Sequence, residues 1–89
     1  MTLRQLSYLV CIVKFGSFSH AARRLAVAQS ALSRQMQLLE AEVGVPLLHR
    51  SGQGVALTPQ GQELLPLAQE IDRLVQSARG VVIGCRPEA

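Results

Sequence analysis

Hydrophobic residues recur every three or four positions along most of the chain, which predicts a protein built mainly from helices. The first helix is expected to start after Thr2, because Thr2 and Gln5 have the spacing of a capping box. Lys14 in its last turn and Gly16 after it predict its end. The apolar stripe of this helix contains Leu3, Leu6, Leu9, Val10 and Val13.

Two further helices are predicted after this one, with a tight turn between them. The shorter spans Phe18–Leu25, and Ser17 can cap its N-terminus. The longer spans about Gln29–Val43. Gly44 is well placed for a left-handed C-terminal cap, and Pro46 prevents continuation of the helix.

The two faces of the longer helix differ in their chemistry. At about 100° per residue, its apolar residues cluster within about 60° of one another, whereas the polar ones occupy a separate arc of about 140°. The apolar residues are Leu32, Met36, Leu39 and Val43. The polar residues are Gln29, Ser30, Ser33, Arg34 and Gln37. A solvated face usually mixes Glu and Lys, so a stripe of amides, hydroxyls and one guanidinium fits either a binding surface or an ordinary polar helix face.

The pattern changes in residues 47–57, where two short apolar segments flank the sequence Ser51, Gly52, Gln53 and Gly54, which is typical of a hairpin turn. These features predict a β-hairpin. Because an isolated hairpin is marginal in water, we expect it to pack on the helices as a wing.

A last helix is predicted over residues 58–79, with Thr58 as its cap and Pro59 at its first position. Pro66 inside it should kink the helix or remove one backbone hydrogen bond. The apolar surface is wider than one small domain can cover, so we predict that part of it packs on the first helix and the rest pairs two chains. The residues assigned to dimerisation are Leu64, Leu67, Ala68, Ile71, Leu74, Val75 and Ala78. The pattern ends at Gly80, so residues 80–89 are expected to form a flexible tail.

The composition fits one small helical domain with a basic surface. The chain has 89 residues, of which 48% are hydrophobic, but it has no Trp, one Tyr and two Phe, so the core must be mainly aliphatic. Its net charge of +3 permits nucleic acid or an acidic membrane surface as a partner. The basic residues Arg23, Arg24, Arg34 and Arg50 lie in the first half, which places the expected contact surface in residues 1–57.

Several function classes receive no support from the sequence. Cys11 lies in an apolar pattern and Cys85 in the expected tail, so they do not form a disulfide framework. His20 and His49 stand alone, without the neighbours that a metal site needs. There is no pair of nucleophile and base and no phosphate loop, so neither an enzyme nor a cofactor is expected. The apolar run of residues 8–13 is too short for a signal peptide or a membrane span, which favours a cytoplasmic protein without a membrane partner.

Two short helices joined by a tight turn and followed by a hairpin describe a mostly α winged helix-turn-helix. In this geometry the second helix of the pair enters the major groove of DNA. Gln can read an adenine edge, Arg can read guanine, and Ser can contact base edges or phosphates. The candidates for base reading are Gln29, Ser30, Ser33 and Arg34, and those for contacts to the DNA backbone or through the wing are Ser17, Gln37, Arg50 and Gln53.

Two alternatives remain open at this point. Arg50 can brace the wing as a surface arginine instead of binding a phosphate. The whole winged surface, together with the last helix, can also serve as a protein–protein interaction module without specific DNA binding.

Five separated blocks closely resemble the LysR-type transcriptional regulators. They are FSHAARRL at 18–25, QSALSRQ at 29–35, LLE at 38–40, GVPLLHR at 44–50 and LTPQG at 57–61, and the resemblance extends over residues 1–79. It implies a DNA-binding domain in residues 1–57 and a linker helix in residues 58–79 that pairs two subunits. It also implies that Gln29, Ser30, Ser33 and Arg34 contact an operator of interrupted inverted repeats, and that Arg50 holds a phosphate near the wing.

The resemblance also implies partners beyond DNA and points to two departures. Family members carry a C-terminal effector domain similar to periplasmic binding proteins, so a small-molecule effector and higher oligomers are expected only with such a domain. An excised domain and a naturally short regulator both fit the sequence. Ala28 stands where a capping Ser or Thr is common, and the wing tip has Gln53 where a basic residue is frequent.

Overall fold

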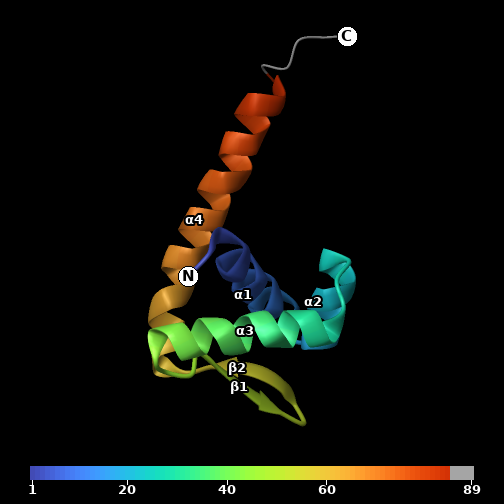
Figure 1. Ribbon diagram of the computed structural model, residues 1–89, viewed down its shortest axis with the longest axis vertical. Helices are drawn as coiled ribbons and strands as arrows, with labels where there is room; N and C mark the ends of the chain where they lie inside the picture. The colour runs from blue at the N-terminus through green and yellow to red at the C-terminus, as the bar shows by residue number, and fades with distance from the viewer. Residues whose placement is uncertain (85–89) are drawn as a thin grey trace.

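The computed structural model describes residues 1–84, and in them it confirms a mostly α winged helix-turn-helix fold (Figure 1). The wing lies along one side of α3, and α4 extends away from the other helices (Figure 1). The elements in chain order are α1 (Leu3–Phe15), α2 (Phe18–Leu25), α3 (Gln29–Val43), β1 (Leu48–Ser51), β2 (Gly54–Leu57) and α4 (Pro59–Gly84).

The predicted helix starts are confirmed by their capping bonds. At the start of α1, the Gln5 N–H donates to Thr2 Oγ1 at 3.0 Å and the Thr2 N–H donates to Gln5 Oε1 at 3.1 Å, which completes the capping box. At the start of α2, the His20 N–H donates to Ser17 Oγ at 3.1 Å. Gly16 is left-handed, with φ of 69°, and ends α1 as predicted.

The turn between α2 and α3 depends on a left-handed alanine. Ala26 has φ of 57°, and its N–H donates to the carbonyl oxygen of Arg23 at 3.2 Å. The Val27 N–H donates to the carbonyl oxygen of Ala22 at 3.0 Å, so the two bonds form a Schellman motif. This motif satisfies the last carbonyls of α2 and sets the direction in which α3 leaves it.

Ala28 precedes α3 in an extended conformation and makes no side-chain capping bond. Ala28→Ser should supply an acceptor for the first turn of α3 and stabilise the protein by about 1 kcal/mol. For a domain of this size, that corresponds to a rise of roughly 4–8 °C in Tm. Thermal unfolding followed by circular dichroism measures it, with Ala41→Ser as the control at an exposed position inside the same helix. An unchanged or lower Tm for Ala28→Ser would contradict the interpretation that a side-chain cap at this position stabilises α3.

The core lies where α1 meets the other three helices and β2. Its largest fully buried side chains are Leu9, Ile12, Leu32 and Leu39. The apolar face of α3 therefore packs inward as the sequence predicts, and its polar face points away from the core.

Part of the dimerisation assignment on α4 is wrong because those residues belong to the core of the chain itself. Ala68 is 0% exposed, so it cannot meet a second chain. Leu64 and Ile71 are partly buried and pack on the same core. Leu67 and Leu74 are exposed by 63% and 53%, and they remain candidates for pairing. The apolar arc of the helix thus has an inner part against α1 and an outer part facing solvent.

The expectation of a flexible tail from residue 80 is wrong for residues 80–84, because α4 continues to Gly84. A glycine inside a helix costs about 1 kcal/mol relative to alanine, which a long helix can tolerate at Gly80. Pro66 also lies inside the continuous helix. The remainder of the expected tail, with Cys85, lies outside the described residues. No helix within residues 1–84 is long and apolar enough to cross a membrane.

Candidate nucleic-acid interface

The polar stripe predicted on α3 is largely free to bind. Gln29, Ser30, Arg34 and Gln37 are exposed, and their side chains make no hydrogen bond or ion pair with another residue in the described range 1–84. Ser33 is half-buried and differs from them because it accepts a hydrogen bond from Arg50. Four polar side chains from one helix can therefore meet a partner without first breaking an internal bond.

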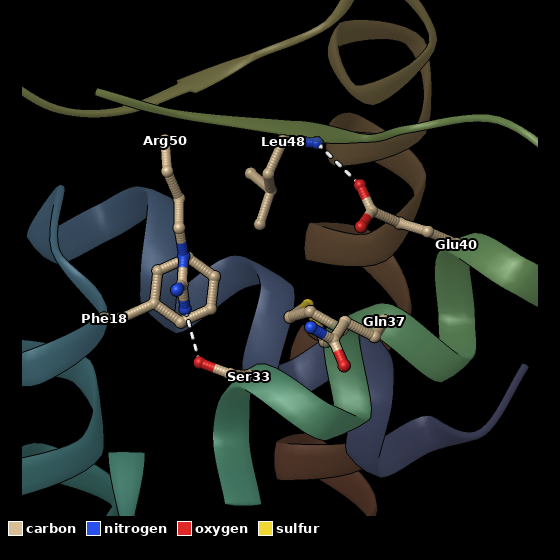
Figure 2. A pocket seen from close by; sticks show the side chains of 7 residues that line it. Phe18, Ser33, Gln37, Glu40, Leu48 and Arg50 are labelled. Atoms are coloured by element: carbon tan, nitrogen blue, oxygen red, sulfur yellow. Dashed lines mark hydrogen bonds between the residues drawn. The ribbon is translucent and has the colours of Figure 1, made fainter. Parts of the chain in front are cut away.

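Arg50 lies between the wing and the helix pair. Its guanidinium carbon sits 3.5 Å from the centroid of the Phe18 ring, and one of its N–H groups donates to Ser33 Oγ (Figure 2). The first contact is a cation–π interaction, and the second links β1 to α3. Arg50 does brace the wing, yet a guanidinium has five N–H donors, so most of them remain available to a phosphate.

The contact with Arg50 also restricts what Ser33 can read. The Ser33 oxygen already accepts a hydrogen bond from a cation. Its own hydroxyl hydrogen is then left to donate. In the proposed interface Ser33 is suited to an acceptor, such as a phosphate oxygen or a guanine edge.

The wing is a short antiparallel hairpin with an exposed tip. Ser51 pairs with Gly54, and the Gln53 N–H donates to Ser51 Oγ at 3.2 Å within the turn. Gly54 has φ of 120°, and a Cβ there would lie 2.9 Å from the carbonyl oxygen of Gly16, so the hairpin closely approaches the loop before α2. The side chain of Gln53 remains exposed, without a positive charge in the turn itself.

A shallow groove joins several of the predicted contact residues. Its lining includes Ser17 before α2, Gln29 at the start of α3, and Arg50 and Gly52 on the wing. Ser17 Oγ lies 3.0 Å from Ser19 Oγ in addition to capping α2. The fold therefore gathers residues that are distant in the sequence along one polar surface.

Two residues at this surface were missed by the sequence analysis. Phe18 was treated only as part of a helix, although its ring supports Arg50. Glu40 was treated only as part of a motif, although its Oε2 accepts from the N–H groups of Leu47 at 2.6 Å and Leu48 at 3.1 Å (Figure 2). A carboxylate four residues before the Gly44 turn was the available signal for the second contact.

The surroundings of His20 and Cys11 are described by the structure. Among residues 1–84, no group of three or more His, Cys, Asp or Glu side chains could hold a metal ion. The His20 ring lies 4.5 Å from the Phe15 ring, centroid to centroid. Cys11 is half-buried, and burial raises the pKa of its thiol, while the nearby charges of Lys14 and Arg24 lower it by less. The thiol is therefore neutral at physiological pH.

Residues 3–62 match the family described as bacterial regulatory helix-turn-helix protein, lysR family. The chain belongs to the LysR family. The transcriptional regulator TcbR of Pseudomonas sp. strain P51 is 42% identical to it over 90 residues, which cover 92% of this chain and 31% of TcbR. The chain thus spans less than a third of the length of this relative.

Solved structures of LysR regulators share the fold. The CbnR DBD–DNA complex superposes with a TM-score of 0.81 at 40% identity, covering 97% of this chain and all of that one. The BenM DBD complex with catB site 1 DNA gives a TM-score of 0.78 at 38% identity, covering 92% of this chain and 97% of that one. The described residues of this LysR-family chain therefore correspond to the DNA-binding region of transcriptional regulators.

Proposed function

We propose that this LysR-family chain binds duplex DNA sequence-specifically as a homodimer, with α3 in the major groove and the wing beside it. The observation that carries this proposal is the exposed stripe of Gln29, Ser30, Arg34 and Gln37 on a helix whose other face is buried in the core. Its amide and guanidinium groups match the edges of adenine and guanine. CbnR and BenM, whose DNA-binding domains share this fold, were solved in complex with DNA, which supports DNA binding by this chain.

Each predicted contact residue has a distinct role in this proposal. Gln29 and Arg34 read base edges, and Ser33 donates to an acceptor. Arg50 binds a phosphate while it remains stacked on Phe18. Ser30, Ser17, Gln37 and Gln53 complete the contacts to bases, backbone and wing groove. The uncharged wing tip should make the affinity contributed by the tip itself weakly dependent on salt.

The dimer is proposed to form through the outer part of α4. Leu67, Leu74 and Val81 are exposed by 63%, 53% and 67%, and they lie one heptad apart. At about 100° per residue they fall within about 40° of one another, and Ala68, which packs on the core, lies at least about 100° away. Ala78 lies between Leu74 and Val81 on the same exposed stripe. Paired subunits would place two copies of α3 on an interrupted inverted repeat.

Partners other than DNA and a second subunit are proposed only under one condition. Higher oligomers and a small-molecule effector are proposed only for a regulator that carries an additional C-terminal domain. The proposed place of action is the cytoplasm, where a bacterial regulator meets the chromosome.

Selection of binding sites from a random duplex pool tests the function directly. The selected duplex should bind at least about a thousandfold more tightly than random duplex, and both affinities should fall with salt. Binding without preference between duplexes and without salt dependence would favour the protein-interaction module instead.

Two variants then test the assignment of the base-reading residues. Arg34→Ala should lower the affinity for the selected duplex by roughly tenfold or more, because a good base contact contributes about 1–3 kcal/mol. Gln29→Ala should relax base preference at one position of each half-site. Fluorescence anisotropy measures both, with Gln69→Ala on an exposed position of α4 as the control. Equal losses on selected and random duplexes for Gln29→Ala would count against direct readout.

A further inference from the structure

A carboxylate at the junction between α3 and the wing is not used by any of the proposed DNA contacts. Glu40 extends from α3 toward β1, and its Oε2 accepts from the N–H groups of Leu47 and Leu48 at 2.6 Å and 3.1 Å (Figure 2). An anion on a helix that faces DNA would be repelled by phosphates unless its charge is directed elsewhere. Here the charge is directed at two backbone donors of the wing, away from the reading residues.

The backbone of the same residue ends the helix. The Gly44 N–H donates to the carbonyl oxygen of Glu40 at 2.8 Å. The tight turn after α3 is therefore held on both sides by Glu40. Its carbonyl oxygen accepts the hydrogen bond that ends α3, and its carboxylate accepts from the N–H groups of Leu47 and Leu48 after the turn.

The opposite side of this segment is held by Thr58, which is 2% exposed. The Thr58 N–H donates to the carbonyl oxygen of Leu47 at 3.0 Å, and the Thr58 hydroxyl donates to the carbonyl oxygen of Pro46 at 2.7 Å. Leu47 is thus bonded to α3 through its N–H and to the start of α4 through its C=O. The strand cannot slide along α3 without breaking these bonds.

The wing strand is attached to α3 a second time near its other end. Arg50 donates to Ser33 there and stacks on Phe18. Two attachments along one strand define its angle to the helix, whereas one attachment would leave it free to pivot. Hydrogen bonds in which the donor or the acceptor is ionised are roughly twice as strong as neutral ones, and both attachments are of this kind.

We propose that Glu40 is a positioning residue that fixes the angle of the wing relative to α3. It thereby decides whether Arg50 and Gln53 reach the DNA backbone while α3 lies in the major groove. The expected effect of Glu40 on DNA binding rests on the proposed function. The expected effect of Glu40 on the angle of the wing rests on the hydrogen bonds at the junction.

The first experiment measures the junction without DNA. Glu40→Met removes the acceptors at similar side-chain length, and Glu40→Gln keeps a neutral acceptor. The matched control is Glu42→Met, at an exposed position of the same helix whose carboxylate pairs with the Met1 ammonium and not with the wing. Amide hydrogen exchange is followed by NMR at Leu47 and Leu48 and, as reporters of global unfolding, at the core amides of Leu9 and Ile12.

In Glu40→Met, exchange at Leu47 and Leu48 should accelerate roughly tenfold or more beyond any change at the core amides, because two donors lose a charged partner. Glu40→Gln should restore part of the protection, and Glu42→Met should leave it unchanged. Equal acceleration of exchange at the junction and core amides, or no acceleration at either, would overturn the proposal that Glu40 holds the wing.

The second experiment uses two duplexes that carry the selected site, one limited to the bases that α3 covers and one extended to the flanks that the wing reaches. Glu40→Met should bind the extended duplex roughly tenfold more weakly than the unmodified chain does, and the loss on the short duplex should be at least threefold smaller. Glu40→Gln should recover part of the affinity for the extended duplex. Equal losses on both duplexes, or no loss on the extended one, would overturn the positioning role. If the unmodified chain binds neither duplex, the proposed function fails, whereas the exchange measurement still decides whether Glu40 holds the wing.

Discussion

Gly61→Ala should destabilise the protein more than a Gly→Ala substitution at any other glycine within residues 1–84. A Cβ at residue 61 would lie 2.2 Å from the carbonyl oxygen of Leu47 and 2.9 Å from Leu57 Cδ2. The Leu47 carbonyl cannot move away freely, because it accepts from the Thr58 N–H and Leu47 is itself 3% exposed. Gly61 is therefore the point where the first turn of α4 rests directly on the junction that holds the wing.

The expected loss for Gly61→Ala is about 3 kcal/mol in the free energy of unfolding, at the upper end for overpacking. It corresponds to a fall of roughly 12–24 °C in Tm for a domain of this size. Thermal and urea unfolding measure it. Gly80→Ala is the matched control, because nothing lies within 4 Å of a Cβ at that position of the same helix. The control should gain about 1 kcal/mol from helix propensity. A Tm for Gly61→Ala within 3 °C of that of the unmodified chain would show that the junction shifts to accommodate the added methyl group.

The boundaries of the first three helices were predictable because their signals are local. The Thr2 and Gln5 capping box, the Ser17 cap, and the glycines Gly16 and Gly44 each act within one turn of the helix that they delimit. Periodicity likewise gave the two faces of α3, because a buried face and an exposed face differ in residue type.

The contacts that shape the interface could not be predicted in this way, since they join residues that are distant in the sequence. Glu40 is an exception, because its place four residues before the Gly44 turn was a local signal for its bonds to Leu47 and Leu48 that the sequence analysis did not use. No local signal pairs Arg50 with the ring of Phe18 or with Ser33. The same reason explains the error at Ala68, which periodicity could not distinguish from a residue of the dimer surface. A wide apolar arc predicts more buried surface than one neighbour can provide, but the position of α1 decides which part of the arc is covered within the chain.

Leu74→Glu should convert the proposed dimer into monomers. Leu74 is 53% exposed in the single chain and lies at the centre of the outer stripe between Leu67 and Val81. A carboxylate there would face its copy or an apolar partner across the interface, and burying an unpaired charge is costly. Because Leu74 lies outside the buried core, the monomer should remain folded, and its Tm should fall only by the stabilisation that dimerisation itself supplied. Ile71→Glu would be less informative, because Ile71 also packs on the core.

Sedimentation velocity measures the mass, and anisotropy with the selected duplex measures the consequence for binding. The unmodified chain should sediment as a dimer and Leu74→Glu as a monomer, with the same charge added at the exposed position of Gln69→Glu as the control. Loss of the second half-site should weaken DNA binding by roughly a hundredfold, the gain that linking two modules provides. A variant that remains dimeric would move the interface to the apolar surface formed by Leu3, Val82 and Ile83 near the end of α4. An unmodified chain that is monomeric even on DNA would instead show that the outer stripe of α4 does not pair these subunits.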